Sequence, residues 1–398
     1  MMRVVFVDDE ENILSGLKRM LRVKRREWDM AFAQSADAAL EMMAVEPFHV
    51  IVSDMRMPGK DGVALLTEVM EKYPDTIRIA LSGHADMEMI LESVRATHQY
   101  LAKPCDAETL IATIDGARKL QDMLRNEKLK KLVSRMDRLP SLPSLYLEVM
   151  SEIREGGSLA KIGKIIAKDV AMTAKVLQLV NSAYFGLRRH IESPAQAATL
   201  LGLDVIRSLV LSTKVFSNFE QKNPALDLQA LWSHSSKVGS LAKEIAIAEE
   251  ASGKVRDNAL MAGMLHGVGK LVLGAGLPEE YRKVAEVMKE KGLTEAEAER
   301  EVLGSNQAEV GAYLLGMWGL PNPIVEAVAY HQRPGAAGGD RFSVLTAVHA
   351  ADAIVRANGA GDVPPDVDME YLARLGLESR VAQWTTLWQE LNTRKEVA

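Results

Sequence analysis

Residues 50–58 are Val50-Ile51-Val52-Ser53-Asp54-Met55-Arg56-Met57-Pro58, a β-branched run that ends in a carboxylate and then enters a loop. A short apolar run bounded by turn residues, here Pro58, Gly59 and Gly62, predicts a buried strand. Asp54 then stands at the C-terminal end of that strand, which is the edge where open α/β sheets carry their chemistry. We expect the N-terminal part of the chain to be organised around Asp54.

The first 120 residues alternate between strand-like and helix-like patterns. Periodic apolar residues predict helices between the strands. Such alternation predicts an α/β fold, a doubly wound five-stranded parallel sheet covered by helices on both faces. Strands are expected at residues 3–7, 30–33, 50–53, 77–81 and 100–102.

The ends of four of these strands carry side chains suited to phosphate chemistry. Asp8 and Asp9 end the first strand, Asp54 the third, Ser82 the fourth and Lys103 the fifth. Three carboxylates at one sheet edge repel one another unless a cation lies among them, and hard oxygen ligands that leave positions to water suit Mg²⁺. A lysine and a hydroxyl directed at the same point suit the oxygens of a phosphoryl group. The set predicts a phosphoryl-transfer site in which Asp54 is the nucleophile.

Four motifs in this region resemble, in order and spacing, the receiver domain of two-component response regulators, which has a flavodoxin-like fold. The resemblance implies that Asp54 takes a phosphoryl group from a histidine kinase, while Asp8, Asp9, Asp54 and the main-chain carbonyl of Arg56 hold Mg²⁺. The motifs are Val7-Asp8-Asp9-Glu10, Ser53-Asp54-Met55-Arg56-Met57-Pro58, Leu81-Ser82-Gly83 and Tyr100-Leu101-Ala102-Lys103-Pro104.

The same resemblance implies roles for the remaining residues of the site. Lys103 and Ser82 bind the phosphoryl oxygens, Tyr100 is the aromatic residue that turns inward on activation, and the peptide bond between Lys103 and Pro104 is expected to be cis. Arg56 and His84 stand where related receivers vary, and they either tune the lifetime of the phosphoryl group or are surface residues without a role. Two further residues are interpreted as structural, His49 and Cys105.

Composition narrows the classes of function. With 398 residues, 47% of them apolar and 26% charged, the chain is globular and long enough for two or three domains. A net charge of −6 disfavours a nucleic-acid-binding surface, and a single Cys excludes a disulfide framework and suits a reducing compartment. Neither a signal-like segment nor an apolar run of bilayer length is predicted. We therefore expect a soluble, cytoplasmic protein that binds neither nucleic acid nor membrane.

Beyond residue 120 the pattern changes to helix upon helix. Residues 121–138 favour a helix that we expect to continue from the receiver as a connector until Pro140 and Pro143 end it. Periodic apolar stretches then predict an all-α region with no strand. The expected division is a receiver at 1–120, a connector at 121–138, a helical domain at 139–358 and an amphipathic helical extension at 359–398, which either packs on the second domain or offers a binding surface.

The helical region looks like the HDOD module, an output domain related to HD-type metal phosphohydrolases. The resemblance runs from about residue 139 to about residue 358, because several motifs recur in order. These motifs are Asp169-Val170-Ala171-Met172-Thr173-Ala174-Lys175-Val176-Leu177, Val180-Asn181-Ser182-Ala183-Tyr184-Phe185-Gly186, Ala197-Ala198-Thr199-Leu200-Leu201-Gly202 and Val205-Ile206-Arg207-Ser208-Leu209.

The catalytic HD pattern needs an early His, an adjacent His-Asp pair and a late Asp that converge on divalent metal. His234, His266, Asp352 and, as a further candidate, His331 match these ligand positions, and His349 stands close to Asp352 in the sequence. We expect a vestigial HD site at these residues.

Gly267 stands where the pattern has the paired Asp. Because glycine has no ligating atom, the dinuclear hydrolytic centre should be lost or badly weakened, although binding of a metal or nucleotide stays open. Residues 263–270 do not match a phosphate-binding loop either, since five residues instead of four separate Gly263 from Gly269 and Leu271 replaces the Ser or Thr.

These observations predict a response regulator. Its receiver would accept a phosphoryl group on Asp54 from a sensor histidine kinase with Mg²⁺ as cofactor, and its HDOD output, with no cofactor and no enzymatic activity, would bind a downstream signalling protein. A homodimer stays open. Two alternatives remain: a metal-dependent HD-type phosphodiesterase acting on a cyclic dinucleotide or another phosphoester, and a nucleotide-sensing module that kept the pocket without the chemistry.

Overall fold

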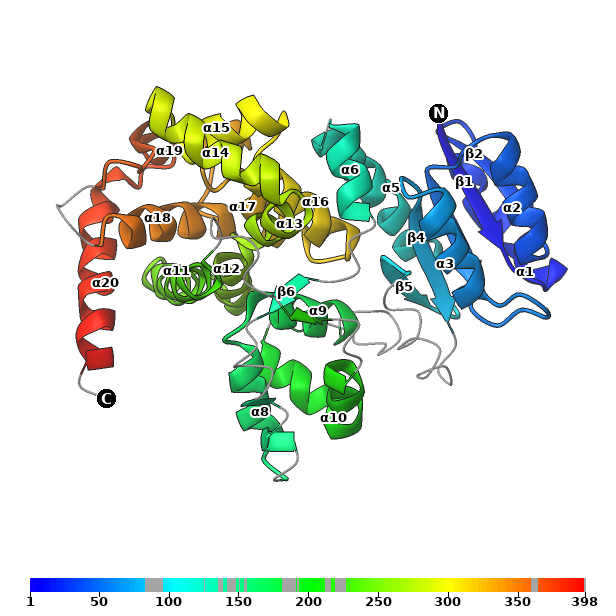
Figure 1. Cartoon of the computed structure of the whole chain (residues 1–398), viewed down its shortest axis with the longest axis horizontal. Helices are drawn as coiled ribbons and strands as arrows, with labels where there is room; N and C mark the ends of the chain where they lie inside the picture. Colours follow the sequence, from blue (N-terminus) through cyan, green and yellow to red (C-terminus); the bar gives the residue numbers. More distant parts are fainter. Residues whose placement is uncertain are drawn as a thin grey trace.

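The structure is a computed structural model of the whole chain (Figure 1), and it describes residues 1–82, 96–124, 126–134, 139–141, 148–149, 151–153, 156–180, 191, 193–211, 216–218, 227–358 and 364–396. An α/β unit lies at one end, and a larger helical body makes up the rest (Figure 1). Gly83, His84 and residues 181–186 of the HDOD-like motifs lie outside the described residues.

The α/β unit is built on a parallel sheet in the order β2-β1-β3-β4-β5. All five residues of β3 are buried, as in a parallel strand that helices cover on both faces. The predicted five-stranded, doubly wound sheet is therefore confirmed. The strands are β1 (Met2–Val7), β2 (Trp28–Ala33), β3 (Val50–Asp54), β4 (Ile77–Ser82) and β5 (Gln99–Ala102).

Side-chain caps begin three of the helices that cover this sheet. Ser35, Asp61 and Asp106 each accept a hydrogen bond from the main-chain N–H three residues further on, which satisfies a donor that the helix itself leaves unpaired. Two apolar cores form, one including Leu65 and the other Leu14. The helices are α1 (Glu11–Met20), the 3₁₀ helix η1 (Leu21–Lys24), α2 (Ala36–Val45), α3 (Gly62–Lys72) and α5 (Ala107–Met123).

The strand register aligns the C-terminal ends of the central strands. Val7 of β1 pairs with Ser53 of β3, and Asp54 of β3 pairs with Leu81 of β4. The residues that follow these strands therefore meet at one edge of the sheet, where we expected the phosphoryl-transfer site.

The connector is a separate helix, α6 (Glu127–Ser134), and this differs from the expectation of one continuing helix. Helix α5 ends at Met123, and Leu124 takes an extended conformation with φ −107° and ψ 102°. Asn126 then caps the new helix, because its Oδ1 accepts the N–H of Leu129 at 3.2 Å. Its Nδ2 donates to the carbonyl of Leu303 at 2.6 Å, so the break is held by the helical body.

The helical body confirms the expected succession of helices, and Gly202, at φ 79°, divides α10 in two. The helices are α8 (Leu159–Ile166), α9 (Val170–Val180), α10 (Pro194–Leu211), α11 (Leu228–Ala248), α12 (Gly253–Leu265), α13 (Val268–Gly276), α14 (Pro278–Lys291), α15 (Glu295–Leu303), α16 (Gln307–Met317), α17 (Asn322–Tyr330), α18 (Val344–Arg356), α19 (Met369–Arg374) and α20 (Val381–Glu396), with the 3₁₀ helices η3 (Pro334–Ala336) and η4 (Glu378–Arg380).

One element of this body is unexpected. A two-stranded parallel sheet pairs β6 (Leu139–Ser141) with β7 (Phe216–Asn218). Strands of this length show no periodicity, and the pairing joins distant segments, so a local pattern could not indicate it.

The C-terminal extension packs on the helical body, which is the first of the two arrangements expected for it. Trp384 of α20 is fully buried, and its Nε1 donates to Glu249 Oε1 at 2.9 Å. Arg380 Nε pairs with the same oxygen at 2.7 Å.

Among the described residues, one helical stretch, Gly253–Gly276, has the length and apolar composition that could cross a membrane. Of its apolar window, 78% is buried inside the molecule.

Candidate functional site

The carboxylates at the sheet edge meet around one ammonium group. Lys103 Nζ lies 2.6 Å from Asp8 Oδ2 and 2.6 Å from Asp54 Oδ1. The other oxygen of Asp54 accepts the main-chain N–H of Arg56 at 3.2 Å, and Asp8 Oδ1 accepts that of Glu10 at 3.0 Å. Residues that are far apart in the sequence, from the ends of β1, β3 and β5, thus come together as predicted.

Burial changes the pKa values of the ionisable groups at this edge. It raises the pKa of the Asp54 carboxyl, and neither the hydrogen bond nor the charge of Lys103 fully reverses this. For Lys103, burial acts against the ammonium, but hydrogen bonds to Asp54 and Asp8 outweigh it and raise its pKa. Two carboxylates therefore share a single cation.

The donor set fits Mg²⁺. Asp8 and Asp54 are buried oxygen donors, and the two carboxylates have one lysine between them. The raised pKa of Asp54 comes first from burial, and the charge of Asp8 adds to it. Asp9, next in the chain, is exposed to solvent at the same edge. Hard oxygen ligands with adjacent water are the arrangement that Mg²⁺ prefers.

A glycine shapes the loop beside Asp54. A Cβ on Gly62 would lie 2.2 Å from the carbonyl oxygen of Asp54 and 2.7 Å from Cα of Met55, so only glycine fits there. The N–H of Gly62 donates to the Met55 carbonyl at 3.0 Å, which holds the loop against the strand end.

The structure also places the other predicted receiver residues. Tyr100 is buried, with 5% of its surface exposed. The main chain of Ser82 ends β4, and its side chain lies outside the described part of the chain. The Lys103–Pro104 peptide bond is cis, as expected. Burial raises the pKa of the Cys105 thiol to about 11, so it is protonated and unreactive at neutral pH.

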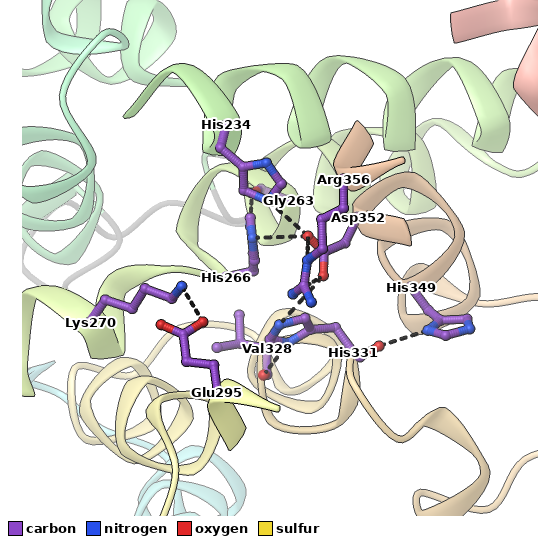
Figure 2. Close-up of polar contacts among 10 residues, drawn as sticks. All are labelled: His234, Gly263, His266, Lys270, Glu295, Val328, His331, His349, Asp352 and Arg356. Carbon is purple, nitrogen blue, oxygen red and sulfur yellow. Dashed lines mark hydrogen bonds and ion pairs between the residues drawn. The ribbon is translucent and has the colours of Figure 1, made fainter. Parts of the chain in front are cut away.

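A second polar cluster lies inside the helical body, where His234, His266 and His331 surround Asp352 (Figure 2). The Nε2 atoms of these three imidazoles lie 2.8, 3.6 and 4.0 Å from the nearest carboxylate oxygen of Asp352. One ligand atom each from His234, His266 and Asp352 falls within 4.8 Å of the other two, which is compatible with a bound metal ion. The four residues come from α11, the segment after α12, the end of α17, and α18.

The hydrogen bonds of the cluster assign the imidazole protons. Nδ1 of His266 donates to the Gly263 carbonyl at 2.6 Å, and Nδ1 of His331 donates to the Val328 carbonyl at 2.9 Å. Their Nε2 atoms therefore carry lone pairs that face a carboxylate, and Nε2 of His331 is buried with no hydrogen-bond partner in the described part of the chain. Such tautomers are those of metal-binding histidines.

The charge states of the cluster follow from its burial. Burial lowers the pKa of His266 to about 3 and that of His331 to about 4, so both rings are neutral at pH 7. Burial by itself would raise the pKa of Asp352, but the hydrogen bond from His234 and the attraction of Arg356 hold it well below its usual value. Because an ionised carboxylate only accepts, His234 must donate its Nε2 proton to Asp352.

The cation beside Asp352 comes from the chain itself. Arg356 Nη2 lies 2.5 Å from Asp352 Oδ2 and its Nε lies 3.1 Å from Oδ1 (Figure 2). Arg356 was not among the predicted site residues, although its position four residues after Asp352 on one helix was a usable signal.

Only side-chain atoms lie beside the position of the missing HD aspartate. A Cβ on Gly267 would lie 2.7 Å from Leu231 Cδ1, the end of a flexible side chain, and 3.3 Å from Ser235 Oγ. Ser235 Oγ is buried and has no hydrogen-bond partner within the described residues. Gly267 itself offers no ligating atom, so the bridging ligand of a dinuclear centre is missing from this position.

His349 is separate from the cluster. Its Nδ1 donates to the main-chain carbonyl of His331 at 2.7 Å, and its Nε2 accepts the N–H of Asp368 at 2.9 Å. Both ring nitrogens are used by the main chain, so His349 supports the fold. His49 is similar, because its Nδ1 accepts the N–H of Arg3 at 2.9 Å.

Known proteins match the two parts of the chain separately. A family model described as the response regulator receiver domain matches residues 4–115, and one described as the HDOD domain matches residues 139–334. An uncharacterized protein of Treponema pallidum is 24% identical over 73% of this chain and 56% of its own length. The hydrogenase transcriptional regulatory protein HoxA of Cupriavidus necator is 37% identical over 30% of this chain and 25% of its own length. The chain thus spans about half or less of these curated relatives.

Among solved structures, the MmoQ response regulator of Methylococcus capsulatus is 24% identical, with a TM-score of 0.47, over 62% of this chain and 98% of its own. An HDOD domain protein of unknown function from Geobacter sulfurreducens is 24% identical, with a TM-score of 0.38, over 71% of this chain and 95% of its own. The family matches, read with the sheet and the helical body described above, show that the chain belongs to the two-component response regulators and consists of an N-terminal receiver domain followed by an HDOD domain.

Proposed function

We propose that this response regulator is switched by phosphorylation of Asp54 and that its HDOD domain is a non-catalytic output that binds a protein partner. The observation that carries the proposal is the position of Lys103 Nζ, 2.6 Å from the oxygens of both Asp8 and Asp54. An ammonium held there is ready to stabilise the charge of a phosphoryl group on its neighbour.

The chemistry is one phosphoryl transfer. A carboxylate oxygen of Asp54 attacks the phosphorus of a histidine kinase's phosphohistidine, so an O–P bond forms and the N–P bond breaks. Asp8, Asp9, Asp54 and the Arg56 carbonyl would hold Mg²⁺, which when bound neutralises phosphate charge. Lys103 and Ser82 would bind the phosphoryl oxygens, and Lys103 would exchange part of its contact with Asp8 for the new anion.

The contacts between the domains support a route from receiver to output. Tyr100, the proposed switch residue, follows Gln99 in β5, and Gln99 Nε2 donates to the carbonyl of Gly316 in α16 at 3.1 Å. Helix α16 also packs against α5 and α6. Any shift of β5 on phosphorylation therefore acts directly on α16.

A cavity of about 560 Å³ remains between the two domains, with Gln99 and Thr113 on the receiver side and Pro321 and Tyr330 on the output side. The domains therefore have room to move against each other. We propose that the chain divides into four units, each of which moves as one body. They are the receiver at 1–120, the connector at 121–138, the HDOD domain at 139–358 and the C-terminal extension at 359–398.

The rival function is a metal-dependent phosphohydrolase. The free Nε2 of His331 and the spacing of His234, His266 and Asp352 favour it. Two observations disfavour it more strongly: Gly267 has no ligating atom where the paired Asp would stand, and Arg356 pairs with Asp352. We therefore propose that the HDOD domain binds a protein partner, without catalysis and without a cofactor.

A nucleotide sensor is a second alternative. A cavity of about 300 Å³ adjoins the cluster, lined among others by Arg300, Arg333 and Arg356. Arg300 and Arg333 both pair with Glu309, at 2.8 and 3.4 Å, and Arg356 pairs with Asp352, so each cation already has a carboxylate. Calorimetric titration with nucleotides tests this alternative, and saturable heat would support it over a purely protein-binding output.

The receiver proposal is tested with acetyl phosphate and Mg²⁺. The wild type and Asp61→Asn should both be phosphorylated. Asp61 is the nearby N-cap of α3, and asparagine caps a helix as well as aspartate does. Asp54→Asn should not be labelled. Equal labelling of Asp54→Asn and wild type would show that the phosphoacceptor is another residue.

The output proposal is tested by turnover and by capture of partners. Cyclic dinucleotides with Mn²⁺ should not be hydrolysed by the full chain, and turnover that His266→Ala abolishes would overturn the non-catalytic assignment. Affinity capture should yield different partners for the phosphorylated and unphosphorylated forms. We further propose a cytoplasmic protein that binds neither nucleic acid nor membrane, and size-exclusion chromatography of both forms tests for a homodimer.

A further inference from the structure

The receiver edge remote from the output domain carries a basic groove. Strand β5 faces the helical body and β2 is the opposite edge of the sheet (Figure 1). Beside β2 a groove of about 820 Å³ runs between α1 and the strand. Its lining includes four cations, Lys18, Arg19, Arg22 and Arg25. Residues 18–26 hold six Lys or Arg in all, in a chain whose net charge is −6.

These four cations have no carboxylate partner within ion-pair distance in the described residues, whereas Lys24 of the same run pairs with Glu27 at 2.9 Å and Asp115 at 2.8 Å. Asp29, the single acidic residue of the lining, pairs with Arg3 at 3.1 Å. The groove therefore has a surplus of positive charge that an acidic ligand would neutralise.

The shape of the groove favours an extended peptide. The lining follows β2 from Trp28 to Phe32, roughly 13 Å of strand, which matches about four residues of a parallel or antiparallel partner strand. Among the described strands, β2 is hydrogen-bonded to β1 alone, so its outer main-chain groups are available for pairing. Met30 and Phe32 are half-buried and lie at the groove, where they offer apolar contacts to alternate side chains of such a peptide.

Other anionic ligands fit less well. Single-stranded nucleic acid needs exposed aromatic faces on which bases stack, but Trp28 is 1% exposed and Phe32 is stacked on Phe6 at 5.3 Å. A membrane surface needs apolar side chains that project outward. Only two large apolar residues here are exposed, Met1 of the lining at 71% and Val23 of the basic run at 73%, while Trp28 is buried and Met30 and Phe32 are half-buried.

We propose that the α1–β2 groove binds an acidic, extended segment of a partner protein, which adds to the edge of the receiver sheet at β2. The segment would alternate acidic residues, which pair with the groove cations, and apolar residues, which contact Met30 and Phe32. This surface is independent of Asp54 and of the contact between the domains, so it would bring the regulator to a partner whatever its phosphorylation state.

The probe is a labelled peptide of alternating Glu and Val, titrated by fluorescence anisotropy against the full chain. Binding should be saturable, should weaken as salt rises, and should fall at least about tenfold in Arg22→Glu/Arg25→Glu. Lys283→Glu/Lys289→Glu, which changes the same charge on the exposed face of α14, should bind as the wild type does. Circular dichroism establishes that each variant is folded, and Arg22→Ala/Arg25→Ala serves if the reversal variant is not.

Three comparisons make the proposal falsifiable. The same peptide with alternate main-chain nitrogens methylated should bind much more weakly if its main chain pairs with β2, and equal binding would overturn strand addition. Vesicles of phosphatidylglycerol and oligo-uridine are the lipid and nucleic-acid probes, and binding of either without the peptide would overturn the assignment. If no probe binds, the proposal is also overturned. The cations would then serve to prevent the free edge of the sheet from pairing with another chain.

Discussion

Gln99 and Gly316 join the two domains, because the side-chain amide of Gln99 donates to the main-chain carbonyl of Gly316 at 3.1 Å. Gly319 lies against the same side chain, and a Cβ there would be 3.3 Å from Gln99 Cδ. Since Tyr100 is the next residue, the receiver strand that carries the proposed switch is also the strand that contacts the output. The docking of the receiver therefore holds β5 and α16 together in the unphosphorylated chain.

Gln99→Ala should loosen this docking. We expect faster hydrogen exchange in α16 of the unphosphorylated variant, approaching that of wild type treated with acetyl phosphate, because a hydrogen bond worth about 1 kcal/mol is lost. The matched control is Gln34→Ala, an exposed glutamine of the receiver. Unchanged exchange in Gln99→Ala would mean that this bond does not contribute to docking.

Lys103→Met should destabilise the receiver when Mg²⁺ is absent. Asp8 and Asp54 would remain buried at the edge without their shared cation, at a cost of about 1–3 kcal/mol. Mg²⁺ should restore part of the loss, because it supplies the missing charge. Urea denaturation with and without Mg²⁺ measures both effects, and Lys72→Met, on an exposed pair, should change little. Equal stability of Lys103→Met and wild type without Mg²⁺ would contradict the charge imbalance described above.

Arg356→Gln should create affinity for Zn²⁺ in the HDOD domain. Without the guanidinium, Asp352 faces the lone pairs of His266 and His331, and a divalent cation replaces the lost charge. We expect at least about a tenfold gain in Zn²⁺ affinity by calorimetry. The gain should disappear in Arg356→Gln/His266→Ala, and Arg333→Gln, at the mouth of the same cavity, is the control. Tight Zn²⁺ binding by the wild type would show that Arg356 does not occupy the cation position.

Glu299 should make the chain less stable as the pH rises from about 5 to about 8, because burial raises its pKa to about 8. The neutral, buried His266 and His331 contribute with the opposite sign up to about pH 6.5, so the Glu299 contribution is read from the difference between variants. The folded chain keeps a proton on Glu299 that the unfolded chain releases near pH 4.5, its ordinary pKa. Between these values the folded state binds more protons, so each rise in pH favours unfolding. Glu299→Gln should remove this contribution, and Glu286→Gln, on the exposed face of α14, should keep it. Urea denaturation across this pH range gives the slopes, and identical slopes for all three chains would contradict the raised pKa.

Gly269→Ala should destabilise the HDOD domain strongly. A Cβ there would lie 1.8 Å from the carbonyl oxygen of Gln307 and 2.9 Å from the N–H of Gly311, both on α16, so α13 and α16 would have to separate. We expect a loss of about 3 kcal/mol or more. Gly16→Ala is the matched control, because nothing lies within 4 Å of its Cβ position in α1, and it should stabilise by about 0.5–1 kcal/mol. A mild effect of Gly269→Ala in thermal denaturation would show that these helices can move apart.

The receiver was predictable because its information is local. The β-branched run before Asp54 and the alternation of strands and helices specify a parallel sheet, and a parallel sheet brings Asp8, Asp54 and Lys103 to one edge. The break between α5 and α6 was not predictable in this way, since Asn126, which caps α6, is held by a hydrogen bond to the distant carbonyl of Leu303. The pairing of β6 with β7 was missed for the same reason, as each strand depends on a distant partner.

The sequence by itself determined which residues could do chemistry: the phosphorylatable Asp54 with its carboxylates and lysine, the four ligand-like residues of the HD pattern, and the loss of an aspartate at Gly267. Only the tertiary structure decided what surrounds them, because burial and neighbouring charge come from packing between segments far apart in the chain. It placed Arg356 on Asp352 and Leu231 beside Gly267, and it set Gln99 against Gly316. Those contacts, and not the identity of the ligand residues, decide whether the vestigial HD site can bind a metal and through which residues the receiver contacts the output domain.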